Sequence, residues 1–196
     1  MRQGTSDTKA RLLAAAKHEF AAHGIAGARV DRIAELAGVN KERIYGYFGN
    51  KQKLFDQVVA QALDELAEAV PLQPGDDPAE YVGRVYDFHS AHPDVVRLFL
   101  WEGLHYREEA LLNEDWRASH YEQKVKALAE TFGTEASPQV AACLLSLIGL
   151  AAWPGAVPQM ARLILGGGVS QADLRAHVVE FARQAVAGTV TVTNDR

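Results

Sequence analysis

The chain has 196 residues and a mass of 21.4 kDa, which is enough for one or two domains that fold without disulfides or metal ions. Hydrophobic residues make up 48% and charged residues 23% of the sequence, a balance that excludes a disordered or collagen-like chain. No apolar run approaches the ~20 residues of a membrane helix, and the N-terminus lacks the apolar stretch of a signal peptide. A single cysteine cannot form an internal disulfide. We therefore expect a cytoplasmic protein that does not enter a membrane.

Charge is distributed unevenly along the chain. Residues 1–51 contain nine basic and five acidic residues, a net charge of +4, whereas residues 52–196 carry a net charge of −9. A basic segment joined to an acidic one is typical of a DNA-binding module fused to a second module. Chance is the alternative explanation, because a charge of +4 is modest.

The elements expected near the N-terminus are helical, because apolar residues recur there at helical spacing. These helices are expected over residues 7–23, 30–37, 41–47 and about 51–70. Proline, glycine and aspartate then gather in residues 71–78, which we interpret as a domain boundary. We therefore expect a first domain over residues 1–51, followed by its linking helix, and a second domain over residues 71–196.

After this boundary six further helices are predicted, near residues 78–91, 94–106, 114–133, 137–152, 157–165 and 171–188. No segment shows the alternation of a half-buried strand. The expected fold class is therefore all-α, with an N-terminal domain of three helices and a larger C-terminal helical domain.

The segment Val30–Lys51 carries the functional signal. Its two short helices are joined by three residues, of which Gly38 permits a sharp reversal, Val39 fills the space between the helices and Asn40 can cap the second helix. This is the layout of a helix-turn-helix, whose second helix enters the major groove of DNA. An ordinary helical hairpin has the same layout.

The second helix of this motif is mostly polar, since only Ile44 and Phe48 face inward. Gly46 weakens the helix by about 1 kcal/mol relative to alanine, which favours a position that DNA approaches closely; close packing against the first helix is the alternative. Lys51 and Lys53 then occupy the first turn of the linking helix, where acidic residues are normally preferred. Two lysines beside free backbone N–H groups indicate a phosphate contact, and random surface charge is the other interpretation.

At these residues the chain resembles the TetR family of bacterial transcriptional regulators. The matching residues are Leu12-Leu13-Ala14-Ala15-Ala16, Glu19-Phe20, His23-Gly24, Val30, Ile33-Ala34, Ala37-Gly38-Val39, Lys41, Ile44-Tyr45-Gly46-Tyr47-Phe48, Lys51 and Leu54-Phe55. The resemblance covers about the first third of the chain. The family commonly has serine or threonine before the second helix, where this chain has Ala28-Arg29, so that side-chain cap is lost.

The resemblance implies a homodimer on a near-palindromic DNA operator, with a small-molecule effector bound in the C-terminal domain. It assigns DNA contacts to Arg29, Lys41, Glu42, Arg43, Tyr45, Gly46, Tyr47 and Lys51. We expect Arg43 to read a base, because a bidentate arginine–guanine contact is the commonest specific one. Glu42 either accepts from a cytosine or serves the helix dipole as an N-terminal acid.

The C-terminal domain is rich in aromatic residues, which would suit a mostly hydrophobic effector. The expected ligand contacts, each of which could instead be a core residue, are Phe88, His89, Phe99, Trp101, His105, Tyr106, Trp116 and Tyr121. The helix over residues 137–152 is apolar on nearly every side, so we expect a partner subunit to cover it. The expected dimer interface comprises Val140, Leu144, Leu147, Ile148, Val178, Phe181, Ala182 and Ala185.

The leading prediction is a repressor that binds double-stranded operator DNA as a homodimer and is released by its effector. A ligand-independent DNA-binding regulator is the first alternative. The second is a helical metal-dependent enzyme that uses the histidines of the C-terminal domain, which are His89, His92, His105 and His120. No cysteine joins them, and no P-loop, dinucleotide fingerprint or nucleophile elbow is found, so we expect no enzymatic activity, no cofactor and no metal.

Overall fold

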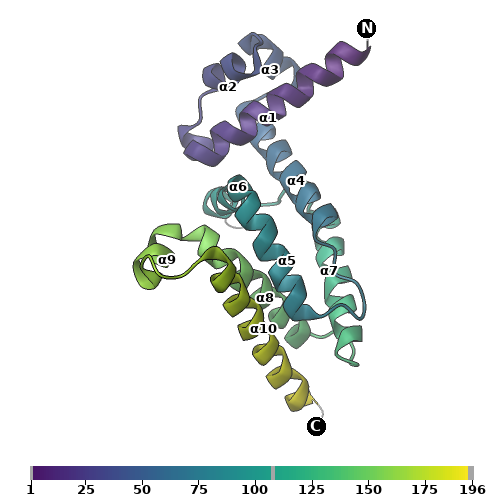
Figure 1. The fold of residues 1–196 in the computed structure, drawn as a ribbon. Helices are drawn as coiled ribbons and strands as arrows, with labels where there is room; N and C mark the ends of the chain where they lie inside the picture. The colour runs from purple at the N-terminus through teal and green to yellow at the C-terminus, as the bar shows by residue number, and fades with distance from the viewer. Residues whose placement is uncertain (1, 107–108, 194–196) are drawn as a thin grey trace. The chain divides into compact units, whose positions relative to one another are not determined.

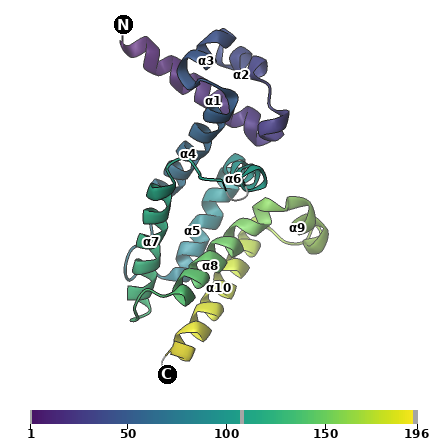
Figure 2. The same cartoon turned by 180° about the vertical axis from the view of Figure 1, so that it is seen from behind.

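The computed structural model describes residues 2–106 and 109–193, and the regular elements of those residues are ten helices (Figure 1, and Figure 2 from behind). The expected all-α fold is confirmed. The chain forms two compact units: an N-terminal unit of residues 1–66 and 93–114, and a C-terminal unit of residues 67–92 and 115–196. Residues 93–105, which the sequence placed in the second domain, thus form a helix that packs on the first helix of the chain.

The N-terminal unit contains α1 (Arg2–Gly27), α2 (Val30–Ala37), α3 (Lys41–Phe48), most of α4 (Lys51–Ala69) and α6 (Pro93–His105). The expected bounds of α2, α3 and α4 agree with these to within one residue. Each helix turns one apolar stripe to a common core, in which Phe20 and Phe55 meet edge to face at 5.2 Å between ring centroids. Helix α2 packs on α1, and α3 packs on α2, so α1 supports the helix-turn-helix through α2.

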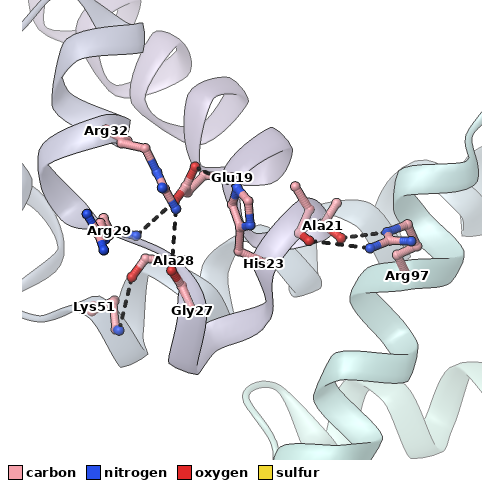
Figure 3. A network of polar contacts seen from close by, with 10 residues as sticks. Glu19, Ala21, His23, Gly27, Ala28, Arg29, Arg32, Lys51 and Arg97 are labelled. Atoms are coloured by element: carbon pink, nitrogen blue, oxygen red, sulfur yellow. Dashed lines mark hydrogen bonds and ion pairs between the residues drawn. The ribbon is translucent and has the colours of Figure 1, made fainter.

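Helix α1 is longer than expected and continues through a kink at Gly24. This residue has φ 64° and ψ 177°, a conformation that glycine adopts far more readily than other residues. At the kink, the carbonyls of Ala21 and Ala22 accept hydrogen bonds from Arg97 of α6, at 2.6 Å from Nε and 3.4 Å from Nη2 (Figure 3). A Cβ at Gly24 would lie only 2.7 Å from the ring of Trp101 in α6. Helix α6 is therefore fastened to the end of α1.

The C-terminal unit contains α5 (Pro78–Ala91), α7 (Glu114–Thr131), α8 (Pro138–Ala156), α9 (Pro158–Leu165) and α10 (Gln171–Thr193). Helix α5 packs on both α8 and α10, which run side by side (Figure 2). Asp77 and Ser137 cap α5 and α8, and a proline follows each of them at the first helical position. These local signals explain why the beginnings of both helices could be predicted closely.

Helix α8 differs from its prediction. It continues past residue 152 to Ala156, with Pro154 in its last turn, where the missing proline N–H removes the helical hydrogen bond that the Leu150 carbonyl would accept. By length and composition α8 is also apolar enough to cross a membrane, which corrects the expectation that no such segment exists. One such helix is weak evidence for a membrane protein, since a core helix of a soluble protein meets the same criterion.

Candidate nucleic-acid interface

The turn between α2 and α3 has the geometry of a helix-turn-helix. Gly38 ends α2 in a left-handed conformation, with φ 65° and ψ 38°, and the Val39 N–H donates to the Ala34 carbonyl at 3.0 Å. Asn40 then caps α3, since its side chain accepts from the Arg43 N–H at 3.3 Å. The two caps fix where one helix ends and the next begins, and they leave one face of α3 on the surface.

The outward face of α3 is open and polar. Of the eight residues of this helix only Ile44 and Phe48 are buried, as the spacing predicted. A hollow of about 440 Å³ on this face is lined by Asn40, Glu42, Arg43, Gly46 and Tyr47. Apart from its two chain neighbours and the backbone of its own helix, no described heavy atom lies within 4 Å of the position that a Cβ at Gly46 would take. Gly46 therefore does not serve close packing against α1, and the space above it is available to a ligand.

Two of the expected DNA-binding cations make contacts within the N-terminal unit. Lys41 Nζ lies 2.8 Å from Asp31 Oδ1 of α2, and this hydrogen bond raises the pKa of the lysine. Lys51 Nζ donates to the Ala28 carbonyl at 3.3 Å, which ties the first turn of α4 to the loop before α2 (Figure 3). Both lysines thus help to position helices, and their phosphate contacts stay predictions.

Three other cations have side chains that form no hydrogen bond or ion pair with any described residue: Arg29, Arg43 and Lys53. Arg29 lies just before α2, Arg43 in α3, and Lys53 in the first turn of α4, where Asn50 accepts from its N–H at 2.8 Å. A surface guanidinium or ammonium group without a protein partner can bind a phosphate or a base edge at no cost in internal contacts. These three residues are therefore the best prepared to bind DNA.

Glu19 of α1 is the residue of this site that sequence reasoning missed. It is 3% exposed, and its carboxylate accepts from the Arg29 N–H and from the Arg32 side chain (Figure 3). The signal that could have revealed it is its position three residues after Ala16 and seven after Leu12, within the apolar stripe of α1. A carboxylate on such a stripe must find partners in the interior.

Four of the expected effector contacts lie in the N-terminal unit: Phe99, Trp101, His105 and Tyr106. Trp101 covers Gly24, as described above. The Tyr106 hydroxyl donates to Asp56 Oδ1 of α4 at 2.5 Å, and His105 Nε2 lies 3.1 Å from Gln52 Oε1 of the same helix. Three of these aromatic residues thus have contacts that hold α6 and the residue after it to α1 and α4.

The other four expected effector contacts lie in the C-terminal unit. Phe88 is half-buried, its ring 4.5 Å from that of His92, and Trp116 and Tyr121 are exposed. His89 of α5 is buried, and neither of its ring nitrogens has a hydrogen-bond partner among the described residues. Among the residues that the structure describes, no three His, Cys, Asp or Glu side chains lie close enough together to bind a metal ion.

The expected dimer interface needs a correction. Five of its eight residues are buried within the single chain and pack in the core of the C-terminal unit: Val140, Leu144, Leu147, Val178 and Ala182. These side chains lie where α5, α8 and α10 pack together, so they are not available to contact a partner subunit. Of the other three, Ile148 is half-buried, whereas Phe181 and Ala185 are exposed. The exposed apolar side of α8 instead presents Leu145 and Trp153, which the sequence did not distinguish from the core residues.

Comparison with known proteins connects this geometry to a family. Residues 12–58 match the model of bacterial regulatory proteins of the tetR family, and residues 77–184 match the tetracyclin repressor-like C-terminal domain. The chain belongs to the TetR family. Every residue to which we assign a DNA contact falls within the first matched TetR segment.

The relatives of this TetR-family chain are regulators. The HTH-type transcriptional repressor SCO4008 of Streptomyces coelicolor is 44% identical over 184 residues, which cover 91% of this chain and 95% of that protein. The repressor NicS of Pseudomonas putida is 34% identical over 122 residues, 59% of this chain and 58% of its own. Among solved structures, the Streptomyces coelicolor regulator SCO4942 is 32% identical, with a TM-score of 0.76 over 91% of this chain and 97% of that chain. The protein is therefore a DNA-binding transcriptional repressor, as predicted.

Proposed function

We propose that this TetR-family repressor binds a near-palindromic operator as a homodimer in the cytoplasm, and that a small, mostly hydrophobic effector in the C-terminal unit releases it. The observation that carries the proposal is the open face of α3, on which the Arg43 side chain has no partner among the described residues. One helix of eight residues reads few base pairs, so two copies about one DNA turn, ~34–36 Å, apart would read a two-fold site.

Within this interface Arg43 reads a base edge, and Gly46 admits the DNA backbone. Glu42, Tyr45 and Tyr47 flank them on the same helix, while Arg29, Lys41, Lys51 and Lys53 surround α3 with positive charge. The cations without internal partners supply most of the phosphate contacts, since the ammonium groups of Lys41 and Lys51 already contact Asp31 and Ala28. Arg29, Lys41, Arg43 and Lys51 are four of the nine basic residues among the first 51.

Selection of duplexes from random DNA by the purified full chain tests the operator proposal, and a near-palindromic site is expected. Arg43→Ala should weaken binding to the selected duplex by about 1–3 kcal/mol and relax the preference at one base position. Lys53→Ala should weaken a selected and a scrambled duplex alike and lower the salt slope by about one. Arg162→Ala, which removes an exposed arginine of α9, is the control and should change neither. If Arg43→Ala leaves the base preference intact, Arg43 is not the reader.

The homodimer is supported by an exposed apolar surface on α8 and α10. Leu145 is 73% exposed and Phe181 is 55% exposed, and Trp153 lies exposed near the end of α8. Around Leu145 the surface consists of small residues, which allow close helix approach: Ala141, Ala142, Ser146 and Gly149. The only hydroxyl among them, that of Ser146, donates to the Ala142 carbonyl at 2.9 Å. A two-fold axis would pair this surface with its own copy and remove its apolar area from water.

Sedimentation of charged variants tests the dimer. Leu145→Glu and Phe181→Glu should each give a monomer, because a carboxylate buried in an apolar interface has no partner. Leu163→Glu on α9 places the same charge at a leucine that is 74% exposed in the same unit, and it should leave the dimer intact. A dimer that survives both α8 and α10 variants would exclude this surface.

Effector binding is supported by His89. Burial lowers the pKa of its imidazole to about 4, so the ring is neutral at pH 7 and carries one donor and one acceptor. Such a ring, 6% exposed and without a hydrogen bond to any described residue, suits one polar group of an otherwise hydrophobic molecule. Release follows if the effector binds more tightly to the arrangement that does not fit the operator.

Small molecules extracted from the purified protein and identified by mass spectrometry test the effector proposal. Added back to the stripped protein, they should weaken binding to the selected duplex, and His89→Phe should reduce that response. If a saturating concentration leaves operator affinity unchanged, the chain is a ligand-independent regulator.

A further inference from the structure

Helix α2 begins without a cap of its own. Its N-cap residue, Arg29, is extended, with φ −117° and ψ 123°, and its side chain makes no capping hydrogen bond. The third helical residue, Arg32, cannot reach back and accept from the N-cap amide as a glutamate does in a capping box, because a guanidinium has no acceptor. Both side chains that usually fix the start of a helix are therefore unsuited to that task here.

Glu19 of α1 supplies the missing acceptor. Its Oε1 accepts from the Arg29 N–H at 2.8 Å and from Arg32 Nε and Nη2 at 2.8 and 2.6 Å. One carboxylate oxygen thus joins the N-cap amide to the third helical residue, which are the two positions that a capping box joins (Figure 3). The difference is that the carboxylate comes from another helix. Its negative charge also lies at the positive end of the α2 dipole.

The Glu19 carboxylate is held in its charged form inside the unit. It is the only buried carboxylate among the side chains that the structure describes. Burial by itself would raise its pKa, but the hydrogen bonds from Arg32 and the Arg29 amide outweigh burial and hold that pKa below its ordinary value. His23 Nε2 lies 3.8 Å from the second oxygen. Hydrogen bonds to a charged carboxylate are among the stronger ones in proteins, so this contact is a firm anchor.

The same contacts hold the loop before α2 from several sides. Arg32 Nη2 also reaches the Gly27 carbonyl at 3.4 Å, and Lys51 donates to the Ala28 carbonyl. The backbone of residues 27–29 is therefore contacted by side chains of α1, α2 and α4 (Figure 3). Since only a short turn separates α2 from α3, any change in how α2 begins is passed on to the reading face of α3.

We propose that Glu19 is a positioning residue for operator binding: it fixes the start of α2, and through α2 the orientation of α3, from a buried position that does not reach DNA. The proposal rests on DNA binding, which family membership shows, and it is independent of effector release and of the identity of the base-reading residue.

The test compares Glu19→Gln with Glu35→Gln in the full chain, on the duplex selected by the unmodified protein and on a scrambled duplex of equal length. Both substitutions remove one negative charge at nearly constant volume, but Glu35 is an exposed residue of α2 outside the network. Glu19→Gln should weaken binding to the selected duplex roughly tenfold and to the scrambled duplex less than about twofold, with an unchanged salt slope. Glu35→Gln should change either affinity by less than about twofold.

A rescue experiment separates capping from other structural effects. Arg29→Ser places at the N-cap a hydroxyl that can accept from the first-turn amides of α2. In this background Glu19→Gln should weaken binding to the selected duplex only about threefold or less. Equal losses in both backgrounds, equal losses on both duplexes, or no loss at all would each overturn the proposal.

Melting curves by circular dichroism establish that each variant is folded at the assay temperature. If Glu19→Gln is not, Arg32→Lys takes its place, because lysine keeps the charge but cannot reproduce the two guanidinium contacts. Arg32→Lys should then show the same selective loss on the selected duplex, at a smaller amplitude, and an equal loss on both duplexes would again overturn the proposal.

Discussion

The two units of the chain treat their buried polar groups in opposite ways. In the N-terminal unit the buried Glu19 carboxylate is surrounded by donors from two arginines. In the C-terminal unit the buried His89 ring forms no hydrogen bond with a described residue, and the buried Lys124 forms no ion pair with one. A unit that reads DNA needs a fixed geometry and has its polar groups satisfied internally. If the C-terminal unit binds the proposed effector, His89 is a group whose hydrogen bonds that molecule could supply.

Lys124 of α7 shows this difference in its charge. It is 6% exposed, and its Nζ donates to the Val70 carbonyl at 3.0 Å and to the Tyr81 hydroxyl at 3.1 Å. Burial, helped by the nearby positive charge of Arg84, lowers its pKa to about 8. The C-terminal unit therefore holds a buried positive charge without the carboxylate that Glu19 provides for Arg32 in the N-terminal unit.

Gly24→Ala should disturb the fixed geometry of the N-terminal unit, and it has the largest expected effect on stability. Alanine at positive φ is strained by about 1–2 kcal/mol, and its Cβ would overlap the Trp101 ring, which adds about 1–3 kcal/mol. We expect the free energy of unfolding to fall by roughly 3 kcal/mol or more, measured by urea denaturation. Gly103→Ala on α6 is the control, because its Cβ would meet no described atom, and it should not destabilise the chain. If Gly24→Ala lowers the free energy of unfolding by less than about 1 kcal/mol, the contact between α1 and α6 can rearrange to accept the methyl group.

Lys124→Met tests the unpaired charge of the C-terminal unit. The native pKa of about 8 lies below the unfolded value of 10.5, so the unfolded chain binds more protons between these pH values. The free energy of unfolding of the natural protein should therefore rise with pH from 8 to 10.5, relative to that of Lys124→Met, by an amount on the order of 3 kcal/mol. Paired urea denaturation curves across this range measure the difference. A difference that does not change with pH would mean that Lys124 is compensated in the folded protein.

His89→Phe applies the same test on the acid side. The native pKa of about 4 lies below the unfolded value of 6.5, so the contribution of His89 to stability is complete above pH 6.5 and is lost as the pH falls toward 4. The natural protein should lose on the order of 3 kcal/mol relative to His89→Phe over that interval. Chemical denaturation of both proteins at several pH values is the measurement, and parallel curves would show that the ring is not kept neutral.

The fold could be predicted closely because its signals are local. Helices α2 and α5 match their predicted bounds, since Gly38 ends the first and Asp77 with Pro78 begins the second. The open polar face of α3 also followed from spacing within one helix. The position of Glu19 on the apolar stripe of α1 is visible in the sequence, but its partners could not be found from spacing within one helix. They lie 10 and 13 residues further along the chain and belong to the loop and helix that follow.

The expected effector contacts stay predictions, and both they and the dimer residues are harder to assign from the sequence for a different reason. Trp101 and Tyr106 have side chains that suit a pocket as well as a core, and only their contacts with Gly24 and Asp56 reveal that they fasten α6 and the residue after it. In α8 nearly every position is apolar, so periodicity cannot say which side faces α5. Composition predicted that α8 is a helix, whereas only its packing within the chain shows which of its apolar residues stay exposed.

Gly46→Ala gives the smallest expected change in stability and sharpens the comparison at the reading face itself. Alanine favours a helix by about 1 kcal/mol over glycine, and its Cβ would meet no described atom, so the free energy of unfolding should rise by up to that amount. Affinity for the selected duplex should nevertheless fall roughly fivefold, because the methyl group would occupy the hollow that we propose as part of the DNA contact. A variant that is more stable and yet binds less cannot owe its weaker binding to a damaged fold. If binding instead rises together with stability, the hollow at Gly46 is not part of the DNA contact, and the reading face must be sought on the Arg43 side of the helix alone.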